Sequence, residues 1–277
     1  MGYFQSIVLG IVQGLTEFLP ISSSAHLVIV PRLLNWSYQG LAYDVALHWG
    51  TLIAVVVYFW KDWLNLITNA IKDHRSRISP GSSLRGAAAT KQSHEKGEPK
   101  LFWYIAMATI PAGLAGIFLE DQAETLFREP RMMALTLIGL GFLLGLSDRV
   151  GAKSKNEDSL GLWPCLAIGC AQALAIIPGV SRSGITITAA LFLGFRREAA
   201  ARFSFLLSTP IVLAAGLLKF KDLSLADMNG PFLIGVLAAA LSGFWAIQFL
   251  IGYLKTKSAG IFVFYRVCLG LLILFWH

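Results

Sequence analysis

The segment from Leu101 to Leu119 contains no charged residue, and a helix of this length can cross most of a bilayer's hydrocarbon core. Such a run constrains the fold strongly, because a lipid-facing helix satisfies its own backbone hydrogen bonds while lipid cannot solvate charged side chains. The whole chain agrees, since 56% of its residues are hydrophobic and only 14% are charged, against roughly 25% charged residues in a typical soluble domain. The sequence therefore predicts an all-α, polytopic membrane protein.

Six apolar runs are predicted to cross the bilayer as helices, with flanking residues extending the shorter ones. They cover residues 43–60, 101–119, 132–148, 203–218, 232–254 and 261–276. Asp44 and His48 lie near the start of the first run and are interpreted as interfacial residues. Residues 72–100, between the first two runs, are polar and are predicted to form a loop.

Two further apolar regions, residues 3–34 and 161–195, are interrupted at their centres by proline and small polar residues. The interruptions read Pro20-Ile-Ser-Ser-Ser-Ala-His26 and Pro178-Gly-Val-Ser-Arg-Ser-Gly184. Non-helical backbone at membrane depth is tolerated only where it is buried in protein or lines a cavity. Each region is therefore predicted to form a re-entrant helical hairpin.

The two interrupted regions match each other when the second is shifted by 159 residues, so that Gly10 meets Gly169 and Gln13 meets Gln172. Three crossings follow each hairpin, and because three is odd, the second half must enter the membrane from the opposite face. This pattern predicts an inverted-topology repeat within a single membrane domain. The domain covers residues 1–277, with one repeat in residues 1–150 and the other in 160–277.

Positive charge is distributed unevenly between the two predicted sides of the membrane. One side carries sixteen of the 23 lysines and arginines, in residues 61–100, 149–160, 196–202 and 255–260. The positive-inside rule assigns this side to the cytoplasm and both termini to the outside. The net charge of +7 thus needs no nucleic-acid partner, because no basic stretch interleaves with stacking aromatic residues outside the apolar runs.

The tips of two inverted hairpins would meet near the membrane midplane and share one site. Ionisable residues inside a membrane are costly and are functional candidates by default. Arg182 offers a planar fork of donors for phosphate or carboxylate, and the serines of both tips add hydroxyl donors. His26 lies three residues after Ser23, a spacing at which it could act as a base toward a serine nucleophile. Glu17 could hold a divalent cation or orient the histidine.

A structural role has to be weighed for each of these residues. Serines in membrane helices commonly pack closely or bond to backbone carbonyls, so the serines alone would favour structure over function. A lone His26 is about equally compatible with packing and with function. Arg182, flanked by two serines deep in an apolar region, favours function. For Arg266, in the last apolar run, a carboxylate partner and backbone carbonyls remain equally open.

Three motifs resemble signatures of the undecaprenyl-diphosphate phosphatase (BacA) family, and the resemblance extends over essentially the whole chain. They are the segment from Gly10 to His26, the segment Pro178-Gly-Val-Ser-Arg-Ser-Gly184, and Arg202-Phe-Ser-Phe-Leu-Leu207 followed by Pro210. The resemblance implies an enzyme that hydrolyses undecaprenyl diphosphate to undecaprenyl phosphate and inorganic phosphate. This activity recycles the lipid carrier for peptidoglycan synthesis and confers bacitracin resistance. It also implies a bacterial inner (plasma) membrane location, a site that opens to the extracytoplasmic side, and a divalent cation, magnesium or calcium.

The resemblance also implies roles for individual residues. Those expected to be catalytic are Glu17, Ser23, His26 and Arg182, with Glu17 also holding the cation. Those expected to bind substrate are Gln13, Ser22, Ser24, Ser181, Ser183 and Gly184. Some family members carry Glu where this chain has Gln13, which weakens any scheme that needs two carboxylates on the metal. The nucleophile is left open between Ser23, His26 and a directly attacking water.

A transporter or flippase of a polyprenyl phosphate is the alternative function, because inverted repeats with broken helices are also an architecture of secondary transporters. Arg182 would serve either activity, whereas Ser23 with His26 favours hydrolysis, since transport needs no nucleophile. The expected partners are the polyprenyl diphosphate and membrane lipids, and a homodimer is left open.

Overall fold

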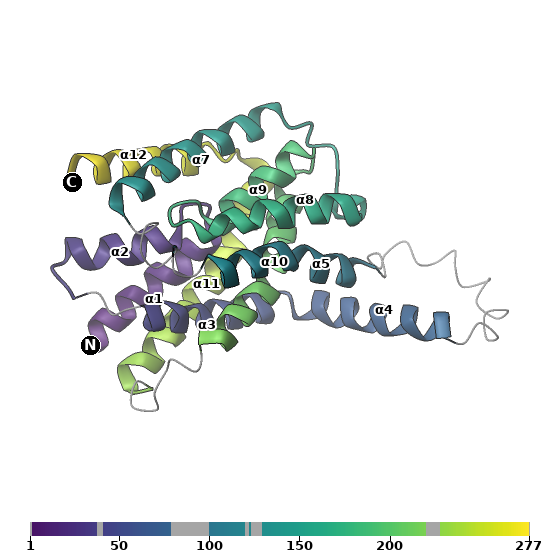
Figure 1. Cartoon of the computed structure of the whole chain (residues 1–277), viewed down its shortest axis with the longest axis horizontal. Coiled ribbons are helices and arrows are strands. Elements are labelled where there is room, and N and C mark those ends of the chain that lie inside the picture. Colours follow the sequence, from purple (N-terminus) through teal and green to yellow (C-terminus); the bar gives the residue numbers. More distant parts are fainter. Residues whose placement is uncertain are drawn as a thin grey trace.

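The computed structural model describes residues 2–37, 41–78, 100–119, 122, 129–219 and 228–276, and within them the chain is almost entirely helical. Strand-like pairing among these residues is limited to an isolated bridge between Lys155 and Phe195. The helices are α1 (Tyr3–Phe18), α2 (Ser23–Leu33), α3 (Leu41–Tyr58), α4 (Trp60–Ile78), α5 (Leu101–Phe118), α7 (Pro130–Val150), α8 (Leu162–Ala173), α9 (Arg182–Phe192), α10 (Arg197–Lys219), α11 (Gly230–Thr256) and α12 (Gly260–Trp276), with short 3₁₀ helices η3 (Glu157–Ser159) and η4 (Leu174–Ile176). Figure 1 shows most of these helices running roughly along the long axis of the molecule.

Four of the six predicted crossings are confirmed as helices that are long and apolar enough to span a membrane, namely α5, α7, α10 and α11. The first predicted crossing is different, because α3 reaches this standard only together with α4, and the two helices meet at a bend of 73°. The last, α12, is apolar but shorter than the others. The chain is therefore a multi-pass membrane protein. Of the predicted polar loop, residues 72–78 belong to α4 and 79–99 lie outside the described residues.

Each interrupted apolar region forms two helices with a short non-helical link. Residues 19–22 separate α1 from α2, and residues 177–181 separate η4 from α9. Ser22 and Ser181, which immediately precede α2 and α9, both have positive φ angles, of 76° and 66°. Few non-glycine residues adopt this backbone conformation, and it persists only where the surrounding structure enforces it. Both links thus carry local strain at the same point.

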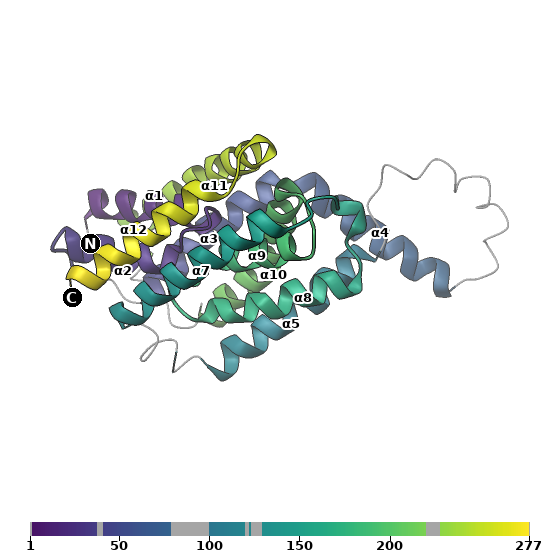
Figure 2. The ribbon, with the colours of Figure 1, turned by 90° about the horizontal axis from the view of Figure 1, so that it is seen from above.

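Small residues let the helices approach closely. A Cβ atom on Gly10 of α1 would lie 2.3 Å from the carbonyl oxygen of Gly235 on α11, and one on Gly169 of α8 would lie 2.1 Å from that of Ala108 on α5. Such contacts fix helix positions by packing rather than by burial from water, as is usual in membranes. Figures 1 and 2 both place α7 alongside α12, and the same two helices are in contact throughout.

The largest buried cluster lies around the helices that frame the two links. It includes Phe18 of α1, Phe59 beside α3, Ile168 of α8, and Phe203 and Phe205 of α10. The spanning helices also carry large apolar side chains that are exposed on the outer surface. Exposed apolar surface on this scale is expected where the neighbour is lipid.

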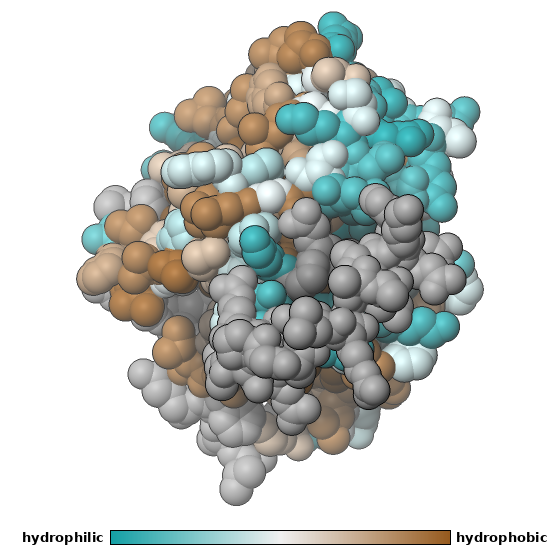
Figure 3. Space-filling view, turned by 90° about the vertical axis from the view of Figure 1, so that its right-hand side faces the viewer, coloured by the Kyte–Doolittle hydropathy of each residue, from teal (hydrophilic) through white to brown (hydrophobic). Residues whose placement is uncertain are grey.

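Ion pairs gather several helix ends at one end of the molecule. Asp148 at the end of α7 pairs with Arg197 at the start of α10 and accepts a 3.0 Å hydrogen bond from the backbone of Ala259 before α12. Arg202 of α10 pairs with Asp62 of α4 at 2.9 Å and with Glu157 of η3 at 2.6 Å. Figure 3, an end-on view, shows hydrophilic residues gathered on part of this face. We call this region the polar end.

Candidate active site

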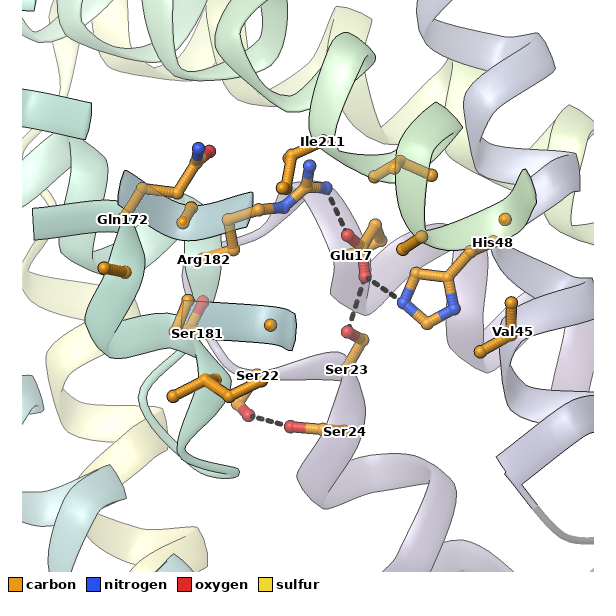
Figure 4. Close-up of a pocket in the computed structure, with 18 residues that line it drawn as sticks. Glu17, Ser22, Ser23, Ser24, Val45, His48, Gln172, Ser181, Arg182 and Ile211 are labelled. Carbon is orange, nitrogen blue, oxygen red and sulfur yellow. Dashed lines mark hydrogen bonds and ion pairs between the residues drawn. The ribbon is translucent and has the colours of Figure 1, made fainter. Parts of the chain in front are cut away.

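A pocket of about 270 Å³ lies where the two interrupted regions meet (Figure 4). Its walls come from α1, α2, α3, α5, α8, α9 and α10, and most are apolar. The polar residues that line it are Glu17, Ser22, Ser23, Ser24, His48, Gln172, Ser181 and Arg182. Six of these were predicted from the sequence, and they come from segments more than 150 residues apart. The fold therefore brings both sequence motifs to one cavity.

The Glu17 carboxylate is at the centre of the hydrogen-bond network in this pocket. Glu17 lies in the last turn of α1 and is buried, with 4% of its side chain exposed, and one oxygen, Oε1, pairs with the Arg182 guanidinium. The other oxygen, Oε2, accepts a hydrogen bond of 2.5 Å from the Ser23 hydroxyl and one of 3.1 Å from Gln13 Nε2. A buried carboxylate needs such partners because burial alone would be very costly. Glu17 is thus held as an anion that touches both motifs.

Arg182 is the first residue of α9 and reaches across to α10. One guanidinium nitrogen, Nη2, pairs with Glu17, and the other, Nη1, donates a 2.9 Å hydrogen bond to the carbonyl of Ser208. About 15% of the side chain remains exposed, toward the pocket that it lines. The guanidinium keeps further N–H donors besides these two. This arrangement suits a bound phosphate, which accepts several charge-assisted hydrogen bonds.

The serines form two similar turns. The hydroxyls of Ser22 and Ser24 lie 3.1 Å apart, and those of Ser181 and Ser183 lie 3.3 Å apart. Ser181 also caps α9, because its hydroxyl oxygen accepts from the backbone N–H of Gly184 at 3.1 Å. Ser183 does not line the pocket, and its hydroxyl donates to the carbonyl of Leu19 at 3.1 Å. The structure thus places Ser183 as a link between the two turns.

His26 lies outside the set of residues that line the pocket. Its Nδ1 is 2.7 Å from the Ser22 carbonyl and its Nε2 is 2.6 Å from the Tyr265 hydroxyl. A carbonyl only accepts, so Nδ1 donates, and in the neutral ring Nε2 accepts from Tyr265. These contacts connect His26 to the strained Ser22 turn and to α12, and neither of them reaches Ser23.

His48 and Gln172 line the pocket, although neither was predicted as a site residue. His48 of α3 was interpreted as interfacial, but its Nε2 lies 3.4 Å from Glu17 Oε2 while its Nδ1 is 2.7 Å from the Asp44 carbonyl. Nothing in the apolar run around His48 signals this contact, because it depends on how α3 packs beside α1. Gln172 did carry a signal, since it matches Gln13 in the 159-residue shift.

Comparison with known proteins matches residues 6–272 to the family described as bacitracin resistance protein BacA. The chain belongs to the BacA family. A protein of Moorella thermoacetica named undecaprenyl-diphosphatase is 49% identical, over 100% of this chain and 99% of that protein. Proteins with the same name from Pelotomaculum thermopropionicum and Elusimicrobium minutum are 48% and 47% identical, over 99% and 97% of this chain and 96% of each relative.

In this BacA-family chain, Arg266 of α12 joins the two interrupted regions from behind the pocket. It is fully buried and donates to backbone carbonyls rather than to a carboxylate, which decides between the two partners left open by the sequence. Its partners are the carbonyls of Pro20 (3.3 Å), Leu137 (3.1 Å), Thr136 (3.4 Å), Gly179 (3.0 Å) and Val180 (3.0 Å). Pro20 precedes the first serine turn, and Gly179 and Val180 precede the second. Arg266 thus holds both turns with one side chain.

Replacing Arg266 with methionine is expected to lower the free energy of unfolding by roughly 3 kcal/mol or more, because buried carbonyls in both links lose their partner. Thermal unfolding of the purified protein in detergent would measure the loss. Arg149→Met is the matched control, since Arg149 is exposed at the end of α7. Equal melting temperatures for the two variants would contradict the role assigned to Arg266.

Proposed function

We propose that this protein hydrolyses undecaprenyl diphosphate to undecaprenyl phosphate and inorganic phosphate. Relatives named undecaprenyl-diphosphatase match it over nearly their whole length. The observation within the structure that supports this chemistry is the contact between the Ser23 hydroxyl and the buried Glu17 carboxylate, which is itself paired with Arg182. A nucleophile, a base and an anion-binding group then meet in one pocket, as phosphoryl transfer requires.

In the proposed mechanism, Ser23 Oγ attacks the terminal phosphorus of the diphosphate and Glu17 accepts the serine proton. The bond from that phosphorus to the bridging oxygen breaks, and the lipid monophosphate leaves. Arg182 stabilises the charge that develops on the transferred phosphoryl group. Water then attacks the phosphorus of the phosphoserine, the bond from that phosphorus to Ser23 Oγ breaks, the proton held by Glu17 returns to Ser23, and inorganic phosphate leaves. Glu17 replaces His26 as the proposed base, because the Ser23 hydroxyl already donates to it at 2.5 Å.

His26 is proposed to position the first turn rather than to move the serine proton. Its ring links the Ser22 carbonyl to the Tyr265 hydroxyl, and it stacks on the Tyr265 ring with an interplanar angle of 11°. These contacts would keep Ser22 in its strained conformation and so direct Ser23 toward Glu17. His48 Nε2 faces Glu17 from the other side. Because its Nδ1 donates to a carbonyl, a proton on Nε2 would make it a second cation beside the carboxylate.

A divalent cation is proposed to bind between Glu17 and the substrate phosphates. Among the described residues, no group of three or more His, Cys, Asp or Glu side chains could hold a metal by itself. Glu17 fits such a cation only with the substrate's help, and magnesium commonly binds through one or two carboxylates plus substrate phosphates. When bound, the ion would neutralise phosphate charge. Both Glu17 oxygens already accept hydrogen bonds, Oε1 from Arg182 and Oε2 from Gln13 and Ser23, so at least one of these donors would have to shift.

The membrane arrangement proposed is an inverted repeat, residues 1–150 and 160–277, with each interrupted region as a re-entrant hairpin. Several observations support it. Shifted by 159, the bounds of α1 and α2 correspond closely to those of α8 with η4 and of α9. Ser22 and Ser181 share a positive φ. The contact of α1 with α11 has its counterpart in that of α8 with α5.

The pocket is proposed to lie near the membrane midplane in the bacterial inner (plasma) membrane, with access from the extracytoplasmic side. Arg182 bonds to Ser208, which is eleven residues along α10 from Arg197 at the polar end. At 1.5 Å per residue this is about 16 Å, roughly half of a hydrocarbon core. Lysines such as Lys155 and Lys257 are exposed near the polar end, and the positive-inside rule assigns such an end to the cytoplasm.

Phosphate release from a prenyl diphosphate by the purified protein in detergent tests the proposed activity. Hydrolysis needs no sealed bilayer, whereas transport does, so the assay separates the enzyme from a polyprenyl-phosphate flippase. We expect steady phosphate release by the native protein. No release with divalent cation present, combined with lipid movement in sealed vesicles, would favour the transporter.

A further inference from the structure

Gln172 is the one pocket-lining residue whose side-chain nitrogen and oxygen are both buried and without a hydrogen-bond partner in the described part of the chain. The residue is 2% exposed and lies in the last turn of α8. A buried amide without partners costs free energy, so native proteins rarely keep one unless a ligand or water satisfies it. Gln172 therefore needs an explanation that the described protein contacts do not provide.

Close packing of α8 against α5 fixes the position of the backbone that carries Gln172. Gly169, one turn earlier on α8, packs directly on the Ala108 carbonyl of α5, which holds the helix in place. The nearest lining residues of the same segment are Ala173, Ala175 and Ile176, which offer no side-chain polar partner. Figure 4 shows the Gln172 side chain on the other side of Arg182 from Glu17. The amide thus remains at one end of the pocket.

Its counterpart in the other half has a different environment. Gln13 of α1 donates from Nε2 to Glu17 and so belongs to the carboxylate side of the site. Within the described ranges of the chain Gln172 has no carboxylate partner, and the charged side chain that lines the pocket next to it in Figure 4 is Arg182. A cation would be repelled at this end, whereas an anion could accept from the guanidinium and from the amide N–H groups together.

We propose that Gln172 donates hydrogen bonds to the phosphate that stays on the lipid, an inference that rests on the proposed function. Ser23 and Glu17 define the end of the pocket where the terminal phosphate reacts. The second phosphate must then lie further along the pocket, where the Gln172 amide offers free N–H donors beside those that remain on Arg182. When the bridging bond breaks, the leaving lipid phosphate gains negative charge, which these donors stabilise. Gln172 thereby selects for a diphosphate and binds the lipid product.

Product inhibition tests this assignment, because the two products would occupy different ends of the pocket. Gln172→Leu should lower kcat/KM for a prenyl diphosphate on the order of 10- to 100-fold, the range for a hydrogen bond to a charged group. It should raise the inhibition constant of prenyl monophosphate by about 10-fold and leave that of inorganic phosphate within about twofold. Gln172→Glu keeps the side-chain shape, and its negative charge should reduce kcat/KM further than the leucine variant does.

Gln248→Leu is the matched control, because Gln248 is exposed on α11, and we expect it to behave like the native protein. An equal change in both inhibition constants for Gln172→Leu would indicate a merely structural role and overturn the proposal. Native-like activity of Gln172→Glu would also overturn the proposal, since an added carboxylate would repel a phosphate bound beside it and weaken its binding. Neither result would contradict the proposed hydrolase activity, whereas a native protein that releases no phosphate would refute it.

Discussion

Replacing Ser23 with alanine is expected to reduce phosphate release from a prenyl diphosphate by at least ~10³-fold, because removal of a nucleophile leaves only binding and electrostatic stabilisation. The hydroxyl lost is the one that donates to Glu17 at 2.5 Å, and the backbone of the turn should be unaffected. Colorimetric phosphate release by protein purified in detergent measures the change. The melting temperature of the variant should match that of the native protein.

Ser24→Ala is the control for this variant, since Ser24 lines the same pocket but its hydroxyl contacts that of Ser22 rather than Glu17. We expect it to lose far less activity than Ser23→Ala. Rapid acid quenching followed by peptide mapping should place a transient phosphate on Ser23. Phosphate on His26 would reassign the nucleophile, and an active Ser23→Ala variant without any phosphorylated residue would support direct attack by water.

Replacing Arg182 with alanine should lower kcat/KM by on the order of 10²-fold or more, as removal of other preorganised donors does. The change removes the group that pairs with Glu17 and that faces the pocket from α9. It also leaves Glu17 buried with fewer partners, so some loss of stability accompanies the loss of activity. Arg182→Lys keeps the charge but not the planar fork, and should recover only part of the activity.

Arg196→Ala controls for loss of an arginine as such, because Arg196 is exposed at the polar end, where it lies 3.5 Å from Asn156. Its phosphate release should equal that of the native protein. Near-native turnover by Arg182→Ala would remove Arg182 from the mechanism. A loss confined to KM would limit it to binding substrate, since transition-state stabilisation must appear in kcat.

The helical architecture could be predicted because membrane helices are defined by local composition. A run such as Leu101–Phe118 can be recognised as a spanning helix from its own residues, since length and apolarity are properties of the segment alone. The prediction was less accurate at residues 43–60, where α3 ends at Tyr58 and α4 leaves at an angle of 73°. The bend lies where Phe59 is fully buried and Arg202 stacks on its ring. Arg202 belongs to α10, so the local sequence around residues 43–60 could not reveal the bend.

The site could be predicted in part, for a similar reason. Charged and hydroxyl residues within apolar sequence are conspicuous, and this identified Glu17, Ser23 and Arg182, which do meet in one pocket. The sequence does not show, however, in which direction such a side chain points in the folded protein. His26 contacts Ser22 and Tyr265, which is 239 residues away, whereas His48, interpreted as interfacial, faces Glu17.

The class of protein, its family and the two interruptions in its apolar segments could be read from the order of the residues along the chain. Which polar groups share the pocket depends on how the helices pack, and so it became known from the folded structure. Arg266 binds five backbone carbonyls, and Gln172 has no hydrogen-bond partner among the described residues, because of how α12, α8 and α5 pack against distant segments. A side chain's chemistry depends on its neighbours in space, and Glu17 contacts both Ser23 in its own half of the chain and Arg182 in the other half.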